Sequence, residues 1–294
     1  MVRVAFIVNP ISGRSKKERI MAEIERRFTR ERGFDVALHK TTGRGDATLA
    51  AAGFARQFYD IVVAVGGDGT VNEVACGLVH TKSALAIVPA GSGNGLARHF
   101  GIPMGYKEAL SIVEKGCSYK LDAGKVNGKY FFCTAGVGFE AIVGEQFNRA
   151  SSRGLVTYIK VCAKVFWNYR REKYRIEMLG RSREERAFLI TFANCNQWGN
   201  NVYIAPYADA SDGMLDIILW HRAPRRYFWL WGFQLLFKRM KRSAFADAYR
   251  IGMLSVEREQ EGPVQLDGDA VVMPAKLDIG VVHNALAIIA PQKS

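Results

Sequence analysis

The chain of 294 residues has no stretch of about 18 uncharged apolar residues, which excludes an ordinary membrane-spanning helix and leaves a soluble or peripheral protein. A strand pattern starts at the first residues without a cleavable signal, so we expect a cytoplasmic protein. Cysteine is scarce and forms no CxxC pair, which fits reduced core residues better than disulfides or zinc sites (Cys76, Cys117, Cys133, Cys162 and Cys195). The five histidines stand singly and are expected to be surface or core groups rather than ligands (His39, His80, His99, His221 and His283).

Acidic residues are few relative to basic ones, 28 against 41, and the formal net charge is +13. Such an excess fits nucleic acid, an anionic membrane surface or an anionic substrate. No recognisable nucleic-acid module accompanies the charge, so no nucleic acid is expected as a partner. Basic residues concentrate in segments 14–32, 160–186 and 222–242. The last has an aromatic centre, and is either a membrane-surface segment or a core helix whose basic side chains reach outward.

The periodicity of the chain changes near residue 120. Before this point, apolar strands alternate with helical stretches, which predicts a Rossmann-like parallel α/β domain over residues 1–120. After it, many short alternating runs predict an antiparallel β-sandwich domain with a few helices over residues 121–294. Each domain is long enough to bury a core of its own. No repeat or low-complexity linker separates the two domains, so we expect them to pack around one cleft. The first four strands are expected at 2–8, 35–39, 61–65 and 85–89, and the main helices at 16–32, 47–57, 71–79, 139–169 and 225–242.

Three polar loops each follow an apolar strand and precede a helix: residues 9–13 (NPISG), 66–70 (GGDGT) and 90–95 (AGSGNG). Glycine lacks Cβ, so its backbone N–H can approach a phosphate, and the following helix adds positive partial charge. Open α/β sheets bind ligands at the carboxyl ends of their strands, so the three loops together predict a phosphate site. Asp68, between glycines, would repel phosphate unless it holds a metal ion or works on a proton, which favours a catalytic role. An ordinary glycine turn is the alternative for any single loop.

These loops, with Leu266-Asp267-Gly268-Asp269, resemble the diacylglycerol kinase catalytic-domain family, above all its stand-alone bacterial members and more distantly sphingosine and ceramide kinases. The resemblance covers nearly the whole chain, whereas NAD kinases and phosphofructokinases share only the GGDG element. It implies transfer of the ATP γ-phosphoryl group to a lipid hydroxyl with Mg²⁺. Thr42 beside Thr41 leaves the choice of threonine open. The nucleotide residues implied by the resemblance are Asn9, Pro10, Ile11, Ser12, Gly13, Thr41, Gly66, Gly67, Asp68, Gly69, Thr70, Val71, Asn72, Glu73, Ser92 and Asn94.

Asp267 and Asp269 are the candidates for the proton acceptor. In an extended strand residues i and i+2 point to the same side, so both carboxylates are expected to face the cleft. The family pattern is Asp-Gly-Glu, and the aspartate found here is shorter by roughly 1.5 Å, which leaves open which carboxylate takes the proton. By resemblance, Asp269 accepts it and Asp267 orients Asp269 or binds Mg²⁺. The alternative is an Asp-Gly hairpin turn of type I′.

A separate metal site is expected in the turn 209–214 (DASDGM), because a carboxylate and carbonyls in a tight turn suit a hard cation. In similar bacterial enzymes this turn holds a structural Mg²⁺. By position, the ligands are the side chain of Asp212 and the backbone oxygens of Asp209 and Met214, and Asp122 links the ion to the active site through water. A plain Asp-Gly turn is the competing interpretation.

The resemblance therefore implies an ATP- and Mg²⁺-dependent lipid kinase, peripheral to the inner, anionic membrane face, with diacylglycerol as the first acceptor. A sphingoid base or ceramide stays open as acceptor, as do a soluble acceptor such as NAD and a non-catalytic nucleotide-binding regulator. Similar proteins are often dimers, so a homodimer is one expected form.

Overall fold

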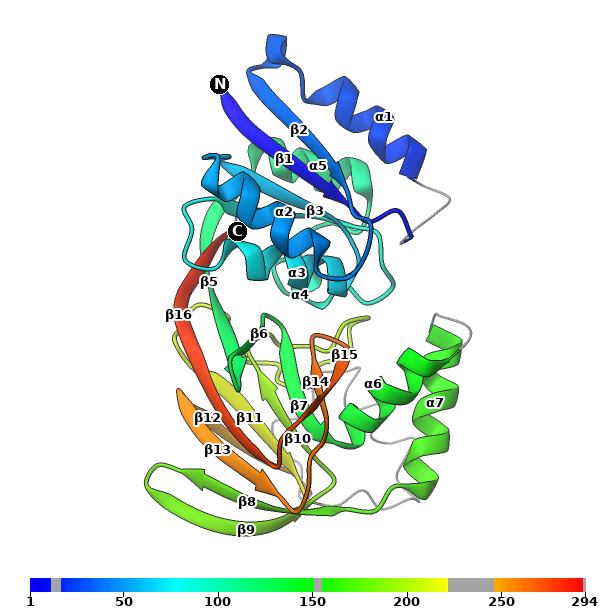
Figure 1. The fold of residues 1–294 in the computed structure, drawn as a ribbon, viewed down its shortest axis with the longest axis vertical. Coiled ribbons are helices and arrows are strands. Elements are labelled where there is room, and N and C mark those ends of the chain that lie inside the picture. The colour runs from blue at the N-terminus through cyan, green and yellow to red at the C-terminus, as the bar shows by residue number, and fades with distance from the viewer. Residues whose placement is uncertain (12–16, 151–154, 222–245, 293–294) are drawn as a thin grey trace. The chain divides into compact units, whose positions relative to one another are not determined.

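The computed structural model describes residues 1–11, 17–150, 155–221 and 246–292 (Figure 1). The chain forms two compact units: Met1–Leu121 with Asn284–Ser294, called unit 1, and Asp122–His283, called unit 2. The sequence division near residue 120 had left the last residues in the second domain. They belong to unit 1 because the end of β16 (Lys276–Ala290) pairs in parallel with β4 (Ala84–Pro89), Ala287 opposite Ala84.

Unit 1 is built on parallel strands, as the sequence predicted, and their order in the sheet is β2-β1-β3-β4. Their bounds are Val2–Val8 for β1, Phe34–Lys40 for β2 and Ile61–Gly66 for β3. β2 lies on one side of β1, and β3 and β4 lie on the other. The direction in which strands are added to the sheet therefore reverses between β1 and β3. Ligands in doubly wound sheets bind at such a reversal, beyond the carboxyl ends of the strands. The loops that begin at Asn9 and Gly66 follow these two strands.

Helices α2 and α3 pack together against the strands and are drawn in front of them in Figure 1. Helix α5 packs on β4 and contacts α1. The helix predicted over 16–32 ends at Arg27, because Thr29 has extended backbone (φ −118°, ψ 158°), and a short 3₁₀ turn follows at Arg30–Arg32. The helices of unit 1 are α1 Lys17–Arg27, α2 Asp46–Arg56, α3 Asp68–Leu78, α4 Gly95–His99 and α5 Tyr106–Lys115.

Unit 2 is antiparallel, as predicted. One six-stranded sheet has the order β12-β11-β10-β7-β14-β15, and a second sheet contains β16-β13-β8-β9 with the β5–β6 hairpin. The six-stranded sheet comprises β7 Thr134–Gly138, β10 Leu189–Ala193, β11 Leu215–Trp220, β12 Ala246–Ile251, β14 Gly262–Leu266 and β15 Asp269–Met273. The other strands are β5 Cys117–Val126, β6 Lys129–Phe131, β8 Glu172–Met178, β9 Arg181–Ala187 and β13 Met253–Arg258.

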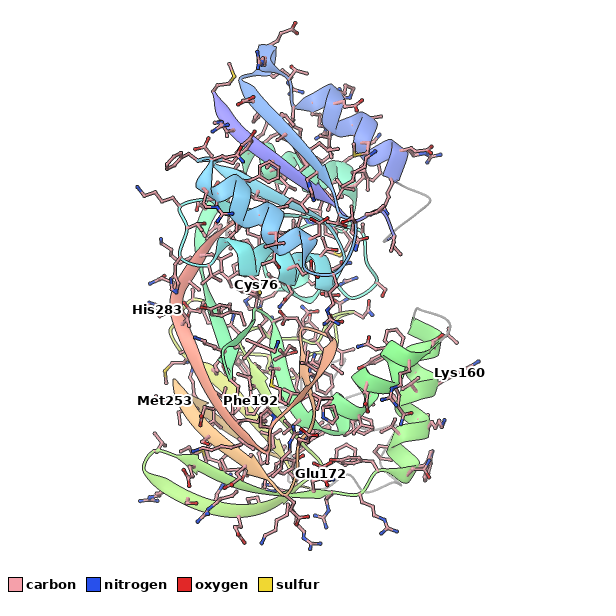
Figure 2. The ribbon with its side chains drawn as sticks, viewed as in Figure 1. Cys76, Lys160, Glu172, Phe192, Met253 and His283 are labelled. Atoms are coloured by element: carbon pink, nitrogen blue, oxygen red, sulfur yellow. The ribbon has the colours of Figure 1, made fainter. Side chains whose placement is uncertain are left out.

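The core of unit 2 contains side chains from both of its sheets, including Phe131, Tyr174 and Phe192, the last of which is labelled in Figure 2. A second apolar cluster contains Phe188, Trp220 and Phe166, the last on one helix of this unit. Phe139, on the other helix, packs against it. The single helical stretch predicted over 139–169 is two helices, α6 Phe139–Arg149 and α7 Leu155–Asn168. Within the described part of the chain, no helix is both long and apolar enough to cross a membrane.

Candidate active site

The first two loops of unit 1 are joined by side chains that follow β1 and β3. Asn9 donates from Nδ2 to the Thr70 hydroxyl at 3.0 Å, and its Oδ1 accepts the N–H of Ile11 at 2.9 Å. A Cβ on Gly66 would lie 2.5 Å from Thr70 Cβ, so only glycine leaves room for this threonine. Asn9 and Thr70, both predicted nucleotide residues, therefore lie together at the start of α3, where unpaired backbone N–H groups favour an anion.

Asp68 ties the second loop to the third. Its Oδ2 accepts the N–H of Asn94 at 2.9 Å, and its Oδ1 accepts the N–H of Gly95 at 2.8 Å. The loops touch closely, because a Cβ on Gly91 would lie 2.6 Å from Gly67 Cα. Burial raises the pKa of Asp68, an effect that the two N–H donors oppose. These contacts give Asp68 a bracing role that the sequence analysis did not predict, beside the catalytic role that it did.

Asp68→Ala is expected to destabilise the protein by roughly 2–4 kcal/mol, because two backbone donors lose a charged acceptor. It should also weaken nucleotide binding, since the two glycine loops lose their link. Urea unfolding and nucleotide titration check both effects. Asp60→Ala is the control, because the Asp60 carboxylate accepts the N–H of Arg3 at an exposed site. Equal stability losses in the two variants would show that Asp68 does not brace the loops.

The choice between the two threonines after β2 is narrowed by their contacts. Thr42 gives both its N–H and its hydroxyl to Asp46, at 2.7 and 2.9 Å, and these donors lower the pKa of Asp46. Thr41 is buried, and its N–H donates to Val8 O at 3.0 Å. Because the Thr42 hydroxyl already serves Asp46, the contacts favour Thr41 as the residue available to a nucleotide.

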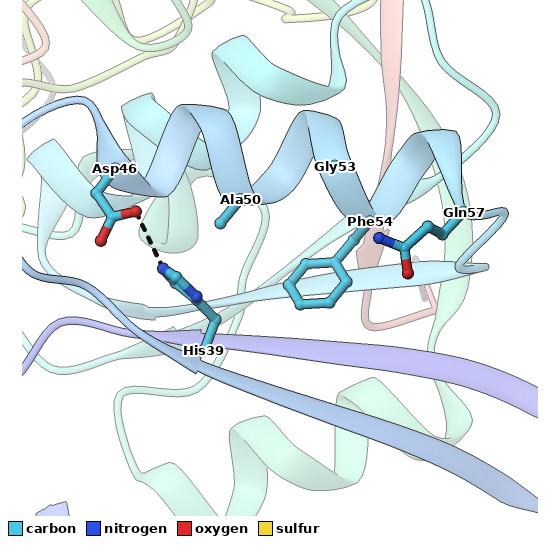
Figure 3. Close-up of a pocket in the computed structure, with 6 residues that line it drawn as sticks. All are labelled: His39, Asp46, Ala50, Gly53, Phe54 and Gln57. Atoms are coloured by element: carbon cyan, nitrogen blue, oxygen red, sulfur yellow. Dashed lines mark hydrogen bonds and ion pairs between the residues drawn. The ribbon is translucent and has the colours of Figure 1, made fainter.

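Glu73 of α3 and Asp46 both make contacts that fix the start of α2. Glu73 Oε1 accepts the N–H of Gly45 at 2.9 Å, and Asp46 Oδ1 lies 3.1 Å from His39 Nε2. Asp46 and His39 border a cavity of about 250 Å³ between β2 and α2 (Figure 3). This cavity is lined mainly by α2 and includes none of the predicted nucleotide residues. Because Glu73 accepts the N–H of Gly45, it has a structural partner in addition to the nucleotide role that was predicted for it.

A larger cavity of about 550 Å³ borders the third loop, at Ala90, Gly91 and Asn94. Asn94 is buried in the left-handed conformation (φ 52°), and its Nδ2 donates to Gly91 O at 2.8 Å. Arg98 also lines the cavity, and its Nε donates to Gly93 O at 3.0 Å. The sequence analysis did not select Arg98, although a cation four residues after Asn94 was a usable signal. Ser92, Gly69 and Gly91 are exposed, so their backbone is accessible to a ligand.

In unit 2, Asp267 is not in an extended strand, and this prediction was wrong. Asp267 (φ 48°) and Gly268 (φ 94°) form a two-residue turn between β14 and β15, with Leu266 paired to Asp269. Positive φ at both positions is the type I′ hairpin turn that stood as the alternative. The two aspartates therefore do not share one face of a strand.

The Asp267 carboxylate accepts three backbone N–H groups from residues 132–134, at and just before the start of β7. Its Oδ2 accepts the N–H of Phe132 at 2.8 Å, and its Oδ1 accepts those of Cys133 and Thr134 at 2.8 and 3.0 Å. The N–H of Asp267 donates in turn to Thr134 O at 2.9 Å. This carboxylate fixes the hairpin in place, and Asp269, which follows the turn, is the half-buried first residue of β15.

Glu140 is a buried acid that the sequence analysis did not select, although it interrupts an apolar stretch. It lies in the first turn of α6, and its Oε1 accepts the Thr191 hydroxyl at 2.6 Å. A Cβ on Gly136 would lie 1.6 Å from this oxygen, so the glycine makes room for the acid. Burial raises the pKa of Glu140 to about 8, against the lowering effects of Thr191 and Trp198. The residue is therefore a neutral acid across most of the physiological range.

Glu140 should make folding stability depend on pH. Its pKa is raised from 4.5 to about 8 on folding. Its contribution to folding stability is therefore complete below pH 4.5 and is lost as the pH rises to about 8. In that window stability should fall by up to about 1.4 kcal/mol per pH unit. Glu140→Gln should remove this slope in urea unfolding at several pH values, whereas Glu145→Gln, on the exposed part of the same helix, should keep it. An unchanged slope in Glu140→Gln would refute the assignment.

The turn predicted to hold a metal ion is brought together with Asp122, as expected. Asp122 Oδ2 accepts the N–H of Gly213 at 2.6 Å, and its own N–H donates to Ala210 O at 2.7 Å. However, Asp212 contacts Met214 N and the Arg250 guanidinium, and Asp209 contacts Ser211. In the described ranges of the chain, no group of three or more His, Cys, Asp or Glu residues could hold a metal ion. The Asp212 carboxylate, the one side-chain ligand expected at this turn, is therefore already engaged by Met214 N and by Arg250.

Some predicted residues lie outside the described ranges. They are Ser12 and Gly13 of the first loop and all of the basic aromatic segment 222–242, including the helix predicted over 225–242.

The site residues thus lie in an α/β unit with two linked glycine loops and in an antiparallel unit with an aspartate hairpin. Two family models match the chain: the diacylglycerol kinase catalytic domain over residues 3–126, and the YegS C-terminal NAD kinase beta sandwich-like domain over residues 133–290. The chain belongs to the diacylglycerol kinase catalytic-domain family, a family of lipid kinases.

Similar proteins agree with this assignment. The diacylglycerol kinase of Bacillus subtilis (strain 168) is 32% identical over 228 residues, which cover 76% of this chain and 75% of the relative. A YegS-like lipid kinase of Chromohalobacter salexigens is 29% identical over 280 residues, covering 90% and 87%. A crystal structure of a diacylglycerol kinase from Bacillus anthracis str. Sterne has the same fold, with a TM-score of 0.77 at 22% identity over 99% of this chain and 97% of that one.

Proposed function

We propose that the protein transfers the γ-phosphoryl group of ATP to the hydroxyl of a lipid, with diacylglycerol as the acceptor and phosphatidic acid as the product. The observation that carries the proposal is the link between the two glycine loops, with Asp68 bound to Asn94 and Gly95. It keeps accessible glycine backbone beside the first turn of α3, a place that suits a polyphosphate. The names of the bacterial relatives support the choice of lipid.

In the proposed reaction Asp269 takes the proton of the lipid hydroxyl as the oxygen attacks the γ-phosphorus. The O–H bond of the acceptor breaks, a new O–P bond forms, and the bond to the β-phosphate oxygen breaks to release ADP. Backbone N–H groups of the glycine loops and the amide of Asn9 would orient the phosphates. Mg²⁺ bound to the ATP phosphates would neutralise the charge that builds on the leaving oxygen.

We also propose that the lipid is taken from an anionic membrane surface to which the protein binds peripherally. The net charge of +13 supports attraction to such a surface. Cytoplasmic location at the inner membrane face is part of the same proposal.

The test is transfer of radiolabel from γ-labelled ATP with Mg²⁺. Vesicles containing diacylglycerol, sphingoid base or ceramide are compared with soluble NAD and with no acceptor. Label in an extractable diacylglycerol product would support the proposal, and label in another lipid would change the acceptor. Label confined to NAD would overturn the lipid assignment, and no label with any acceptor would favour a non-catalytic regulator.

A further inference from the structure

The turn 209–214 is closed by its own polar groups. Asp209 Oδ1 accepts the N–H and the hydroxyl of Ser211, at 3.1 and 2.7 Å, and Asp212 Oδ1 accepts the N–H of Met214 at 2.9 Å. Gly213 has a φ of 75°, which lets the chain reverse between the second of these short-range contacts and β11. The folded shape of the turn therefore does not depend on an ion to gather its backbone.

Asp122 holds the turn against β5 by direct hydrogen bonds. Its side chain is fully buried, its Oδ2 accepts the Gly213 N–H, and its Oδ1 accepts from His283 Nδ1 at 2.9 Å. The His283 ring lies over the turn, because a Cβ on Gly213 would be 3.2 Å from Nδ1, and Figure 2 labels His283. A carboxylate that reaches the turn itself needs no water or ion between them.

A second basic side chain lies at the other end of the turn. Arg250 on β12 contacts Asp212 Oδ2 through Nη2 and lies opposite Asp216 in the β11–β12 pairing. Burial raises the pKa of Asp216, and the charge of Arg250 opposes this. A divalent cation bound to Asp212 would sit beside the guanidinium, and like charges at such range repel.

We infer that Arg250 and His283 take the place of a structural divalent cation at the turn 209–214, so that unit 2 of this protein is stable without one. The inference concerns the folded protein and stands apart from any Mg²⁺ that accompanies ATP. It explains why the turn and Asp122 come together although the carboxylates of the turn are committed to protein donors.

The test uses the full chain without nucleotide, and therefore does not depend on kinase activity. The unfolding temperature should be the same in EDTA and in excess Mg²⁺, and Mn²⁺ should show no bound species by electron paramagnetic resonance. A tightly held ion would instead raise the unfolding temperature by roughly 5–10 °C at a hundredfold excess over its dissociation constant. Such a rise, or one bound Mn²⁺ per chain, would overturn the inference.

Variants distinguish an Asp212 that pairs with Arg250 from an Asp212 that binds a metal ion. Arg250→Gln should lower the unfolding temperature in EDTA, whereas Arg149→Gln, an exposed arginine paired with Glu145 on α6, should not. Equal unfolding temperatures for the two variants would refute a role of Arg250 in the turn. If Arg250→Gln does not fold, Asp212→Asn decides: the loss should be equal in EDTA and Mg²⁺, and a loss confined to Mg²⁺ would mark Asp212 as a metal ligand.

Discussion

Asp269→Asn is expected to lower phosphoryl transfer to lipid by roughly 10²–10⁴-fold, the usual contribution of a positioned proton acceptor. Asparagine keeps the size of the side chain and an oxygen, but it cannot take the proton of the attacking hydroxyl. The free energy of unfolding should stay close to that of the parent, because Asp269 is half-buried at the first position of β15. Rates with vesicle-bound diacylglycerol, measured with a urea unfolding curve on the same preparation, check both expectations.

Asp278→Asn is the matched control for Asp269→Asn, since Asp278 is an exposed aspartate on a strand of the same unit. It should keep full activity. If Asp269→Asn transfers phosphate at the parental rate, Asp269 is not the proton acceptor and another carboxylate must be sought.

Asp267→Ala is expected to lower the free energy of unfolding strongly. Its carboxylate accepts three backbone N–H groups, from Phe132, Cys133 and Thr134. Hydrogen bonds to a charged group contribute more than neutral ones, and three abandoned donors should cost roughly 3–5 kcal/mol of unfolding free energy. The hairpin that carries Asp269 loses its anchor in the same change, so activity should fall as well.

Glu177→Ala is the control for Asp267→Ala, because Glu177 is an exposed acid on β8 whose contact with Arg175 is 3.9 Å long. Exposed pairs of this kind contribute at most about 1 kcal/mol. A stability loss in Asp267→Ala no larger than that of Glu177→Ala would show that the three hydrogen bonds do not anchor the hairpin.

Unit 1 was predictable from the sequence because its signals are local. Runs such as Ile61–Gly66 are apolar without interruption, as expected for strands buried on both faces, and glycines mark the turns that follow. The family resemblance then located most of the loop residues. The sequence could not predict that Asp68 accepts the N–H groups of Asn94 and Gly95. This contact depends on how two turns 26 residues apart meet in space.

Unit 2 was harder because its strands are short and some are polar. β9 (RSREERA) lacks an apolar pattern, yet it pairs with β8 along its whole length, where Lys173 and Glu184 form an ion pair at 2.7 Å. An edge strand of this kind is stabilised by its partner rather than by its own composition. The geometry at Asp267 was missed for a similar reason, since its three donors lie more than 130 residues earlier in the chain.

The pairing of β16 with β4 has a consequence for synthesis on the ribosome. Ala287 and Ile288, which complete the sheet of unit 1, are made after all of unit 2. Until they emerge, one side of β4 lacks its neighbour, and an unpaired strand edge invites association with other chains. A fragment of residues 1–121 made to study nucleotide binding would keep that open edge permanently. The nascent protein therefore depends on the end of β16 to close this edge of its first half.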